Sequence, residues 1–212
     1  IIGCLDVPTE GAYLLDGRDV GRMTRRELAN IRNEKLCFIF QQYNLLPKLS
    51  LLENVEVPLV YAGIPAAQRH AKAKATLERV GLGTKLKNKP NQLSGGMRQR
   101  AALIRTLAVN PELLLLDEPF SALDYQTRLS VCDDIASIIK KENKTAILVT
   151  HDLSEAISVA DRVIVLSSRP ATVRRIVPIS VSIPDRTPMR TRNAPEFKDY
   201  FNLLWKELNH HE

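Results

Sequence analysis

The sequence lacks long hydrophobic runs and is poor in cysteine. No apolar stretch in its 212 residues approaches the ~18 residues that a membrane-spanning helix needs, so no span is predicted. The three cysteines, Cys4, Cys37 and Cys132, are far apart and odd in number, which favours reduced thiols in the cytoplasm over a disulfide framework or a metal site. No signal peptide is visible, and the apolar start at Ile1, without a Met, indicates a truncated beginning.

Aromatic residues are also scarce, at 5% of the chain, although the net charge is +6. No stretch interleaves basic and aromatic side chains as a nucleic-acid-binding surface does, so no nucleic-acid partner is predicted. The basic residues form only modest clusters, at residues 22–32, 85–89 and 186–192. Such clusters are typical of solvated surface, with an acidic partner or a lipid surface as the alternative.

The sequence does contain short apolar segments that alternate with amphipathic ones. Apolar residues make up 44% of the chain, enough for a sizeable core. Strands are predicted at residues 12–15, 36–40, 113–116, 145–150 and 162–166, and helices at 24–33, 126–142 and 154–160. This alternation favours a mainly parallel α/β sheet, in which the segments 113–116 and 145–150 are predicted to be buried strands.

Two segments depart from the alternation. Residues 45–109 are mostly helical in pattern and predict a lobe inserted into the α/β core. After Pro178 a basic, proline-rich linker leads to an amphipathic helix at residues 195–208, with Phe197, Phe201, Leu204 and Leu208 on one stripe. Because the polar face of this helix mixes acids with lysines, we expect it to fold back on the core or on a partner subunit rather than on a membrane. A frayed tail is the alternative.

The segment LLLLDEP at residues 113–119 joins a run of leucines to two acids. Ligands of parallel α/β sheets bind at the carboxyl edge of the strands, which is where Asp117 and Glu118 are expected. At that edge Asp117 is suited to hold Mg²⁺, directly or through water, and Glu118 to take a proton from an attacking water. Two solvated acids at the end of a strand are the alternative.

The segment LSGGM at residues 93–97 opens a predicted helix. Ser94 is suited to cap that helix. Gly95 and Gly96 let backbone N–H groups approach an anion closely, and the positive end of the helix favours a phosphate. A plain Ser-Gly-Gly helix cap explains the same residues.

Polar residues follow two further strands and the acidic pair. His151 comes directly after residues 145–150, where an imidazole is suited to reach a terminal phosphate. Gln41 follows residues 36–40, where an amide is suited to bind a metal-bound or attacking water. Asp124, in the SALD segment at residues 121–124, is suited to cap the next helix. Taken singly, a structural histidine and an ordinary polar loop residue are the commoner explanations.

In this order the motifs resemble the nucleotide-binding domain of ABC transporters over the length of the chain. The family's Q-loop corresponds to Gln41, its signature motif to residues 93–97, its Walker B to 113–117 and its D-loop to 121–124. The signature has Met97 where Gln is commonest. The resemblance implies a P-loop NTPase-type α/β fold, the ABC ATPase domain, at residues 1–178 with the helical lobe at about 45–109, and the linker and helix at 179–212.

The resemblance also implies ligands and their residues. ATP is the substrate and Mg²⁺ the cofactor, with Glu118 and His151 as catalytic residues. Metal binding falls to Asp117 and Gln41. The nucleotide contacts implied come from Gln41, Ser94, Gly95, Gly96, Met97 and Asp124.

The implied partners are a second ATPase subunit, in a head-to-tail homodimer around ATP, and transmembrane permease subunits. Such a protein is peripheral, at the cytoplasmic face of the cell membrane. Two alternatives are a soluble ABC-type ATPase acting on nucleic acid or the ribosome, and a non-catalytic module that binds partners.

One motif of the family is missing. No segment matches the Walker A pattern G-x-x-x-x-G-K-[ST], and the segment GLGTK at residues 81–85 has the wrong spacing. In the family this motif precedes a stretch that resembles residues 1–6. We therefore expect an N-terminally truncated domain that is inactive alone.

The resemblance divides between two branches of the family. Residues 1–93 resemble the lipoprotein-release and macrolide-export branch, whereas the remainder resembles importer subunits for nitrate, sulfonate or taurine. The two halves are either a natural branch or a join. The transported substrate and the direction of transport therefore stay open.

Overall fold

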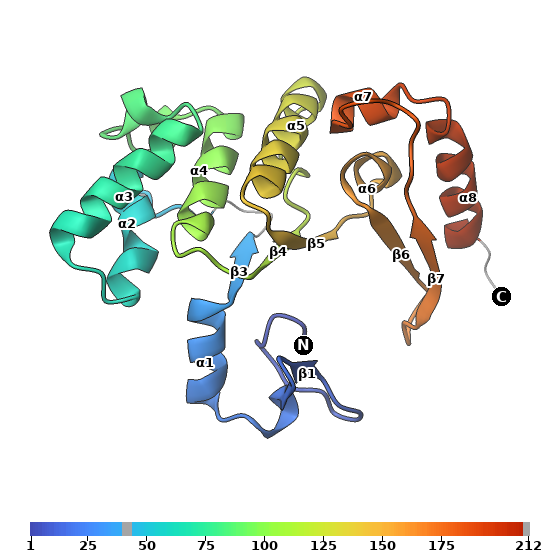
Figure 1. Ribbon diagram of the computed structural model, residues 1–212, viewed down its shortest axis with the longest axis horizontal. Coiled ribbons are helices and arrows are strands. Elements are labelled where there is room, and N and C mark those ends of the chain that lie inside the picture. The colour runs from blue at the N-terminus through green and yellow to red at the C-terminus, as the bar shows by residue number, and fades with distance from the viewer. Residues whose placement is uncertain (40–43, 210–212) are drawn as a thin grey trace.

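The computed structural model describes residues 1–39 and 44–209. Figure 1 shows a central sheet with a helical region on one side and a C-terminal region on the other, while the N-terminal segment hangs below. The sheet consists of β3 (Leu36–Ile39), β4 (Leu113–Asp117) and β5 (Thr145–Val149), which are parallel and in the order β3-β4-β5. The mainly parallel α/β sheet predicted from the alternation of strands and helices is thus confirmed.

The middle strand, β4, is buried as its leucine run predicts, with Leu114 inaccessible to solvent and Leu116 nearly so. The prediction that residues 145–150 form a buried strand is wrong in its burial, because β5 is mostly exposed, with Ile147 at 37% and Val149 at 56%. The physical reason is that β5 pairs with β4 alone among the described strands. The described N-terminal residues Ile1, Ile2 and Leu5 border the apolar face that these two side chains present, but they leave it partly exposed.

Residues 45–109 are largely helical, as predicted, and form α2 (Leu51–Tyr61), α3 (Ala66–Arg79) and α4 (Gly95–Leu107). Ser50 and Glu53 form a capping box at the start of α2. One cluster of buried side chains runs from α2 and α3 through α4 to β4 and the next helix, α5 (Tyr125–Lys141). The helical region and the sheet therefore share a single hydrophobic core.

The N-terminal segment folds around local signals. Asp16 and Gly17, both with positive φ, form the turn between the short strands β1 (Leu14–Leu15) and β2 (Arg18–Asp19), the pairing that a two-residue hairpin turn favours. A short 3-10 turn then leads to α1 (Arg25–Glu34), whose predicted capping box between Thr24 and Glu27 is present. A small cluster of buried residues around Cys4 and Leu28 holds this segment together.

The C-terminal region contains α6 (Leu153–Val159) and two antiparallel strands, β6 (Arg162–Leu166) and β7 (Val173–Pro178). The sequence pattern did not predict β7, because Arg174 and Arg175 interrupt its apolar run. The structure accommodates both arginines through Glu207, which lies 2.5 Å from Arg175 Nη1 and 3.8 Å from Arg174 Nε.

The proline-rich segment after Pro178 is more ordered than the predicted linker. It contains the short helix α7 (Pro188–Arg192), which begins with a proline at its first position and is capped by Thr187. The backbone N–H of Met189 also donates to Asp133 Oδ1 of α5, at 2.7 Å. The Thr187 cap and the contact with Asp133 together hold this proline-rich segment as a helix against α5.

The last helix, α8 (Phe197–Asn209), packs on α6 and β6. Leu204 is fully buried there among Ile157, Val165, Val177 and Ile179, whereas Leu208 is 44% exposed. The helix therefore folds back on its own chain through the first three residues of the predicted stripe, Phe197, Phe201 and Leu204. Within the described residues, no helix has both the length and the apolar character needed to cross a bilayer.

Replacing Leu204 by Ala is expected to lower the free energy of unfolding by about 2–5 kcal/mol, because it leaves a cavity in a fully buried site. Leu208→Ala, on the same helix but exposed, is the matched control and is expected to change stability little. Urea denaturation of the two variants measures the difference. Equal stabilities would contradict the packing of α8.

Candidate active site

The two acids and the histidine lie at one edge of the sheet because β4 and β5 are parallel and in register. Asp117, the last residue of β4, is paired with Val149, the last residue of β5. The backbone N–H of Glu118 extends this pairing by donating to the Val149 carbonyl at 2.9 Å. His151 follows two residues after Val149, so both chain segments leave the sheet side by side.

Glu118 and His151 are in direct contact. Glu118 Oε1 lies 2.6 Å from His151 Nδ1 and accepts the backbone N–H of His151 at 3.0 Å. Glu118 has a left-handed backbone, with φ of +47°, a conformation that non-glycine residues adopt rarely and that is often found at functional sites. The histidine side chain remains 81% exposed, so it is open to a ligand.

The carboxylate of Glu118 changes the acid–base behaviour of this histidine. Its hydrogen bond, followed by its negative charge, raises the pKa of His151, and Glu155 and Asp152 add to the effect. The imidazolium is therefore favoured next to the carboxylate. Such a pair combines a group that accepts a proton with a group that donates to a phosphate oxygen.

Asp117 is exposed at the end of β4, beside a cavity of about 490 Å³ that is otherwise apolar and lined in part by Ile2, Leu115 and Ile147. Among residues 1–39 and 44–209, no three His, Cys, Asp or Glu side chains gather to hold a metal. One carboxylate nevertheless fits Mg²⁺, which commonly takes one or two carboxylates together with waters and substrate phosphates. The second predicted ligand, Gln41, lies outside the described residues.

The residues of LSGGM lie at the start of α4, in a different element from the acidic pair. Ser94 caps the helix, with its Oγ accepting the backbone N–H of Met97 at 3.3 Å. Gly96 is buried, and a Cβ there would lie 3.1 Å from Val131 and 3.3 Å from Thr127 of α5. Gly96 thus allows α4 and α5 to pack closely, whereas Ser94 and Gly95 remain at least partly accessible.

Asp124 caps α5, as its position predicted, and its Oδ1 accepts the backbone N–H of Thr127 at 3.0 Å. Hydrogen bonds from Thr127 hold the pKa of Asp124 below its ordinary value. The carboxylate is therefore engaged with its own helix. A nucleotide contact from Asp124 stays a prediction.

Sequence reasoning missed one residue close to the histidine, Glu155. Glu155 is buried, only 2% exposed, and its Oε2 accepts the hydroxyl of Thr150 at 2.8 Å. Burial raises the pKa of Glu155. The spacing of Asp152 and Glu155, a helix cap and an acid three residues later, is the sequence signal that could have indicated an ordered turn here.

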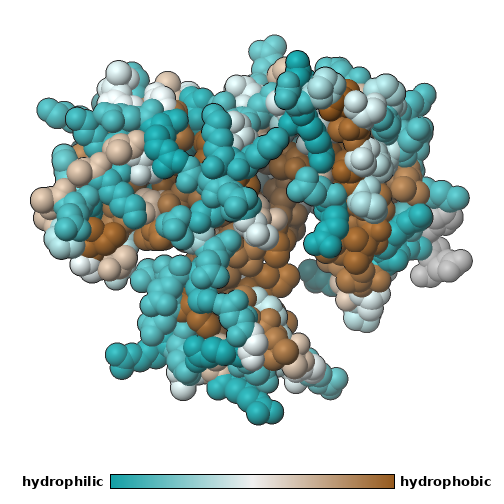
Figure 2. All heavy atoms as spheres, viewed as in Figure 1, coloured by the Kyte–Doolittle hydropathy of each residue, from teal (hydrophilic) through white to brown (hydrophobic). Residues whose placement is uncertain are grey.

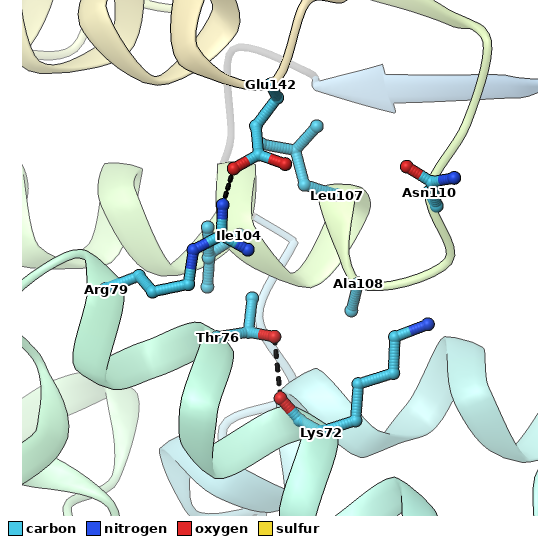
Figure 3. A pocket seen from close by; sticks show the side chains of 8 residues that line it. All are labelled: Lys72, Thr76, Arg79, Ile104, Leu107, Ala108, Asn110 and Glu142. Carbon is cyan, nitrogen blue, oxygen red and sulfur yellow. Dashed lines mark hydrogen bonds and ion pairs between the residues drawn. The ribbon is translucent and has the colours of Figure 1, made fainter.

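A second cavity, of about 220 Å³, lies between α3, α4 and the end of α5. Figure 3 shows Arg79 of α3 reaching Glu142 in an ion pair across it, with the Thr76 hydroxyl turned to the Lys72 carbonyl at 2.6 Å. None of its lining residues belongs to the Glu118–His151 pair. We place the candidate active site at the sheet edge, where the titratable side chains converge.

Comparison with known proteins identifies the family. The family model described as "ABC transporter" matches residues 1–121. The chain belongs to this family of ABC transporter ATP-binding proteins. It is 42% identical over 209 residues to the uncharacterized ABC transporter ATP-binding protein YtlC of Bacillus subtilis, covering 99% of this chain and 77% of that protein.

Exporters of this family are also similar. The chain is 46% identical over 164 residues to the macrolide export ATP-binding/permease protein MacB of Aggregatibacter actinomycetemcomitans, covering 77% of this chain and 25% of that protein. An uncharacterized ABC transporter ATP-binding protein of Thermotoga maritima is 50% identical over 156 residues, which span 72% of this chain and 65% of the relative. These relatives are considerably longer than the matched region.

The fold agrees with a solved ABC cassette. The chain superposes with a TM-score of 0.71 and 38% identity on the ATP-binding cassette MJ0796, described as a dimeric post-hydrolysis state bound to ADP and Pi. The match covers 84% of this chain and 78% of that one. The predicted ABC ATPase fold and the relation to the export branch are therefore confirmed, whereas the importer likeness of the second half stays a prediction.

Glu118→Gln is expected to move the titration of His151 to lower pH, because it removes the carboxylate that favours the imidazolium. The raised pKa stabilises the fold below the ordinary histidine pKa, and this contribution is lost as the pH rises through the folded-state value. Nuclear magnetic resonance of the imidazole, assigned with His151→Gln, measures the shift. An unchanged titration would show that the contact is absent in solution.

Proposed function

We propose that this chain is the ATP-hydrolysing subunit of an ABC transporter and acts in a head-to-tail dimer around Mg-ATP. The observation that carries the proposal is the Glu118–His151 contact at the carboxyl edge of β4 and β5. Family membership and the dimeric cassette MJ0796 support it. The chemistry needs a proton acceptor and a phosphate contact side by side, and this edge supplies both.

Each residue at the edge has a part in the proposed reaction. Glu118 accepts the proton of the attacking water while that water's oxygen bonds to the γ-phosphorus and the bond to the β–γ bridging oxygen breaks. His151 donates to an oxygen of the γ-phosphate. Asp117, together with Gln41, would hold Mg²⁺, and the ion would supply positive charge to the phosphates. Most of the acceleration then comes from positioning and charge stabilisation.

The signature residues serve the ATP bound to the other subunit in this proposal. Ser94, Gly95, Gly96 and Met97 open α4, where the positive end of the helix dipole favours a phosphate. Asp124, in the loop that follows the acidic pair, is proposed to contact the nucleotide as well. This division explains why the signature lies on an element separate from the Glu118–His151 pair.

The partners are proposed from the family. The relatives named ATP-binding/permease proteins combine the two functions in one chain, which supports permease subunits as the partners here. The subunit is then peripheral, at the cytoplasmic face of the membrane.

The sheet face beside Asp117 supports the proposal that a further segment completes the site. Figure 2 shows hydrophobic residues gathered in the middle of the view, where Figure 1 places the central sheet. The exposed apolar side chains of β5, Ile147 and Val149, border the cavity there. We propose that a segment with the pattern G-x-x-x-x-G-K-[ST], which residues 1–212 do not contain, covers this face. We call a protein with that segment the extended protein.

Residues 1–212 alone are expected to bind Mg-ATP only weakly, because the pattern whose lysine and backbone N–H groups cradle the phosphates is missing from them. Titration calorimetry with Mg-ATP measures this, with the extended protein as the positive control. A micromolar Kd for residues 1–212 would refute it.

In the extended protein, Glu118→Gln is expected to lower turnover by roughly 10²-fold or more, the usual scale of general-base catalysis. ATP binding is retained, so the ATP-bound dimer accumulates in size-exclusion chromatography. Glu112→Gln, in the exposed residue just before β4, is the matched control and leaves turnover unchanged. Turnover within a few-fold of the parent would exclude Glu118 as the base.

A further inference from the structure

Arg128 lies in the first turns of α5, between the loop after Glu118 and the loop around His151. Its Nη2 donates to the Leu123 carbonyl at 3.1 Å. Its Nη1 donates to Asp152 Oδ2 at 3.4 Å and lies 3.7 Å from Glu155 Oε1. One guanidinium therefore contacts both loops at once, and 75% of its side chain is removed from solvent, since 25% is exposed.

The contacts on the histidine side continue to His151 itself. The buried Glu155 accepts the Thr150 hydroxyl at 2.8 Å, and Thr150 Oγ1 accepts the backbone N–H of Asp152 at 3.1 Å. These bonds hold the residues immediately before and after His151. The orientation of the His151 side chain therefore depends on the position of the Glu155 carboxylate.

The contacts on the other side continue to Glu118. The Ser121 hydroxyl donates to the Glu118 carbonyl at 2.9 Å, and Leu123, whose carbonyl Arg128 binds, follows two residues later. With the Glu118–His151 bond the contacts close into a ring. The ring runs through Glu118, Ser121, Leu123, Arg128, Glu155, Thr150 and His151.

We propose that Arg128 is a positioning residue that fixes the Glu118–His151 pair by holding residues 118–124 against residues 150–155. The inference rests on the proposed function, because the pair matters through ATP hydrolysis. A planar guanidinium presents several donors in a fixed fork, so it binds a carbonyl and two carboxylates together. A lysine ammonium keeps the charge but lacks this fork.

A purely structural role for Arg128 predicts different effects of its replacement. If Arg128 only compensated the buried charge of Glu155, its loss would destabilise the whole domain, and Lys would replace it fully. A positioning role requires the fork, so that Lys preserves the fold without restoring the geometry of the two loops.

The first test measures ATP hydrolysis by the extended protein. Arg128→Gln and Arg128→Lys are expected to lower kcat about 10- to 100-fold with KM for Mg-ATP unchanged, the scale of a small misplacement of catalytic groups. Arg100→Gln is the matched control, because Arg100 also makes an ion pair with α5, to Asp134 at 2.7 Å. An unchanged kcat in Arg128→Lys, or an equal loss in Arg100→Gln, would overturn the proposal.

The second test is independent of hydrolysis and uses hydrogen exchange of the nucleotide-free extended protein. Arg128→Lys is expected to speed exchange of amides in residues 118–124 and 150–155, with the rest of the domain and the melting temperature matching Arg100→Gln. Uniformly faster exchange, or no change in these loops, would overturn the proposal. If Glu118→Gln hydrolyses ATP normally while the loops still loosen, the proposed function fails and the coupling by Arg128 stands.

Discussion

The parallel register between β4 and β5 is the constraint on which the rest of the candidate site depends. Asp117 is paired with Val149, and the Glu118 N–H donates to the Val149 carbonyl. A shift of this register by one residue would turn each side chain to the opposite face and separate Glu118 from His151. The burial of Leu114, Leu115 and Leu116 anchors β4 in the core, and its backbone pairing with β5 sets the register.

The same core joins the sheet to the helical region. Buried side chains of α2, α3 and α4 form one cluster with β4 and α5, and Gly96 lets α4 approach α5 closely. The segment that opens α4 therefore serves two purposes in our proposal, as a packing contact within the chain and as a phosphate site for the partner's ATP. A larger residue at Gly96 would disturb the packing of α4 against α5 before it affected the phosphate site.

The apolar faces of α8 and β5 differ in how far the described residues cover them. The C-terminal helix α8 finds its cover within the chain, on α6 and β6, and buries Leu204 completely. The apolar face of β5 is only partly covered by the described residues, and Asp117, at the end of the neighbouring strand β4, lines the cavity beside it. Because exposed apolar patches usually mark interaction sites, this face supports a further segment at the candidate active site.

The sequence by itself determined the elements whose signals are local. Periodicity and caps placed α1, α5 and α8 and the leucine strand, and the order of motifs identified the ABC ATPase fold. Only the tertiary structure decided which face of β5 stays exposed, that Arg174 and Arg175 belong to a strand, and that Glu118 contacts His151, 33 residues away in the chain. Arg128 and Glu155 escaped notice for the same reason. Their contacts depend on how distant segments are brought together, whereas caps and periodicity depend on neighbours within a few residues.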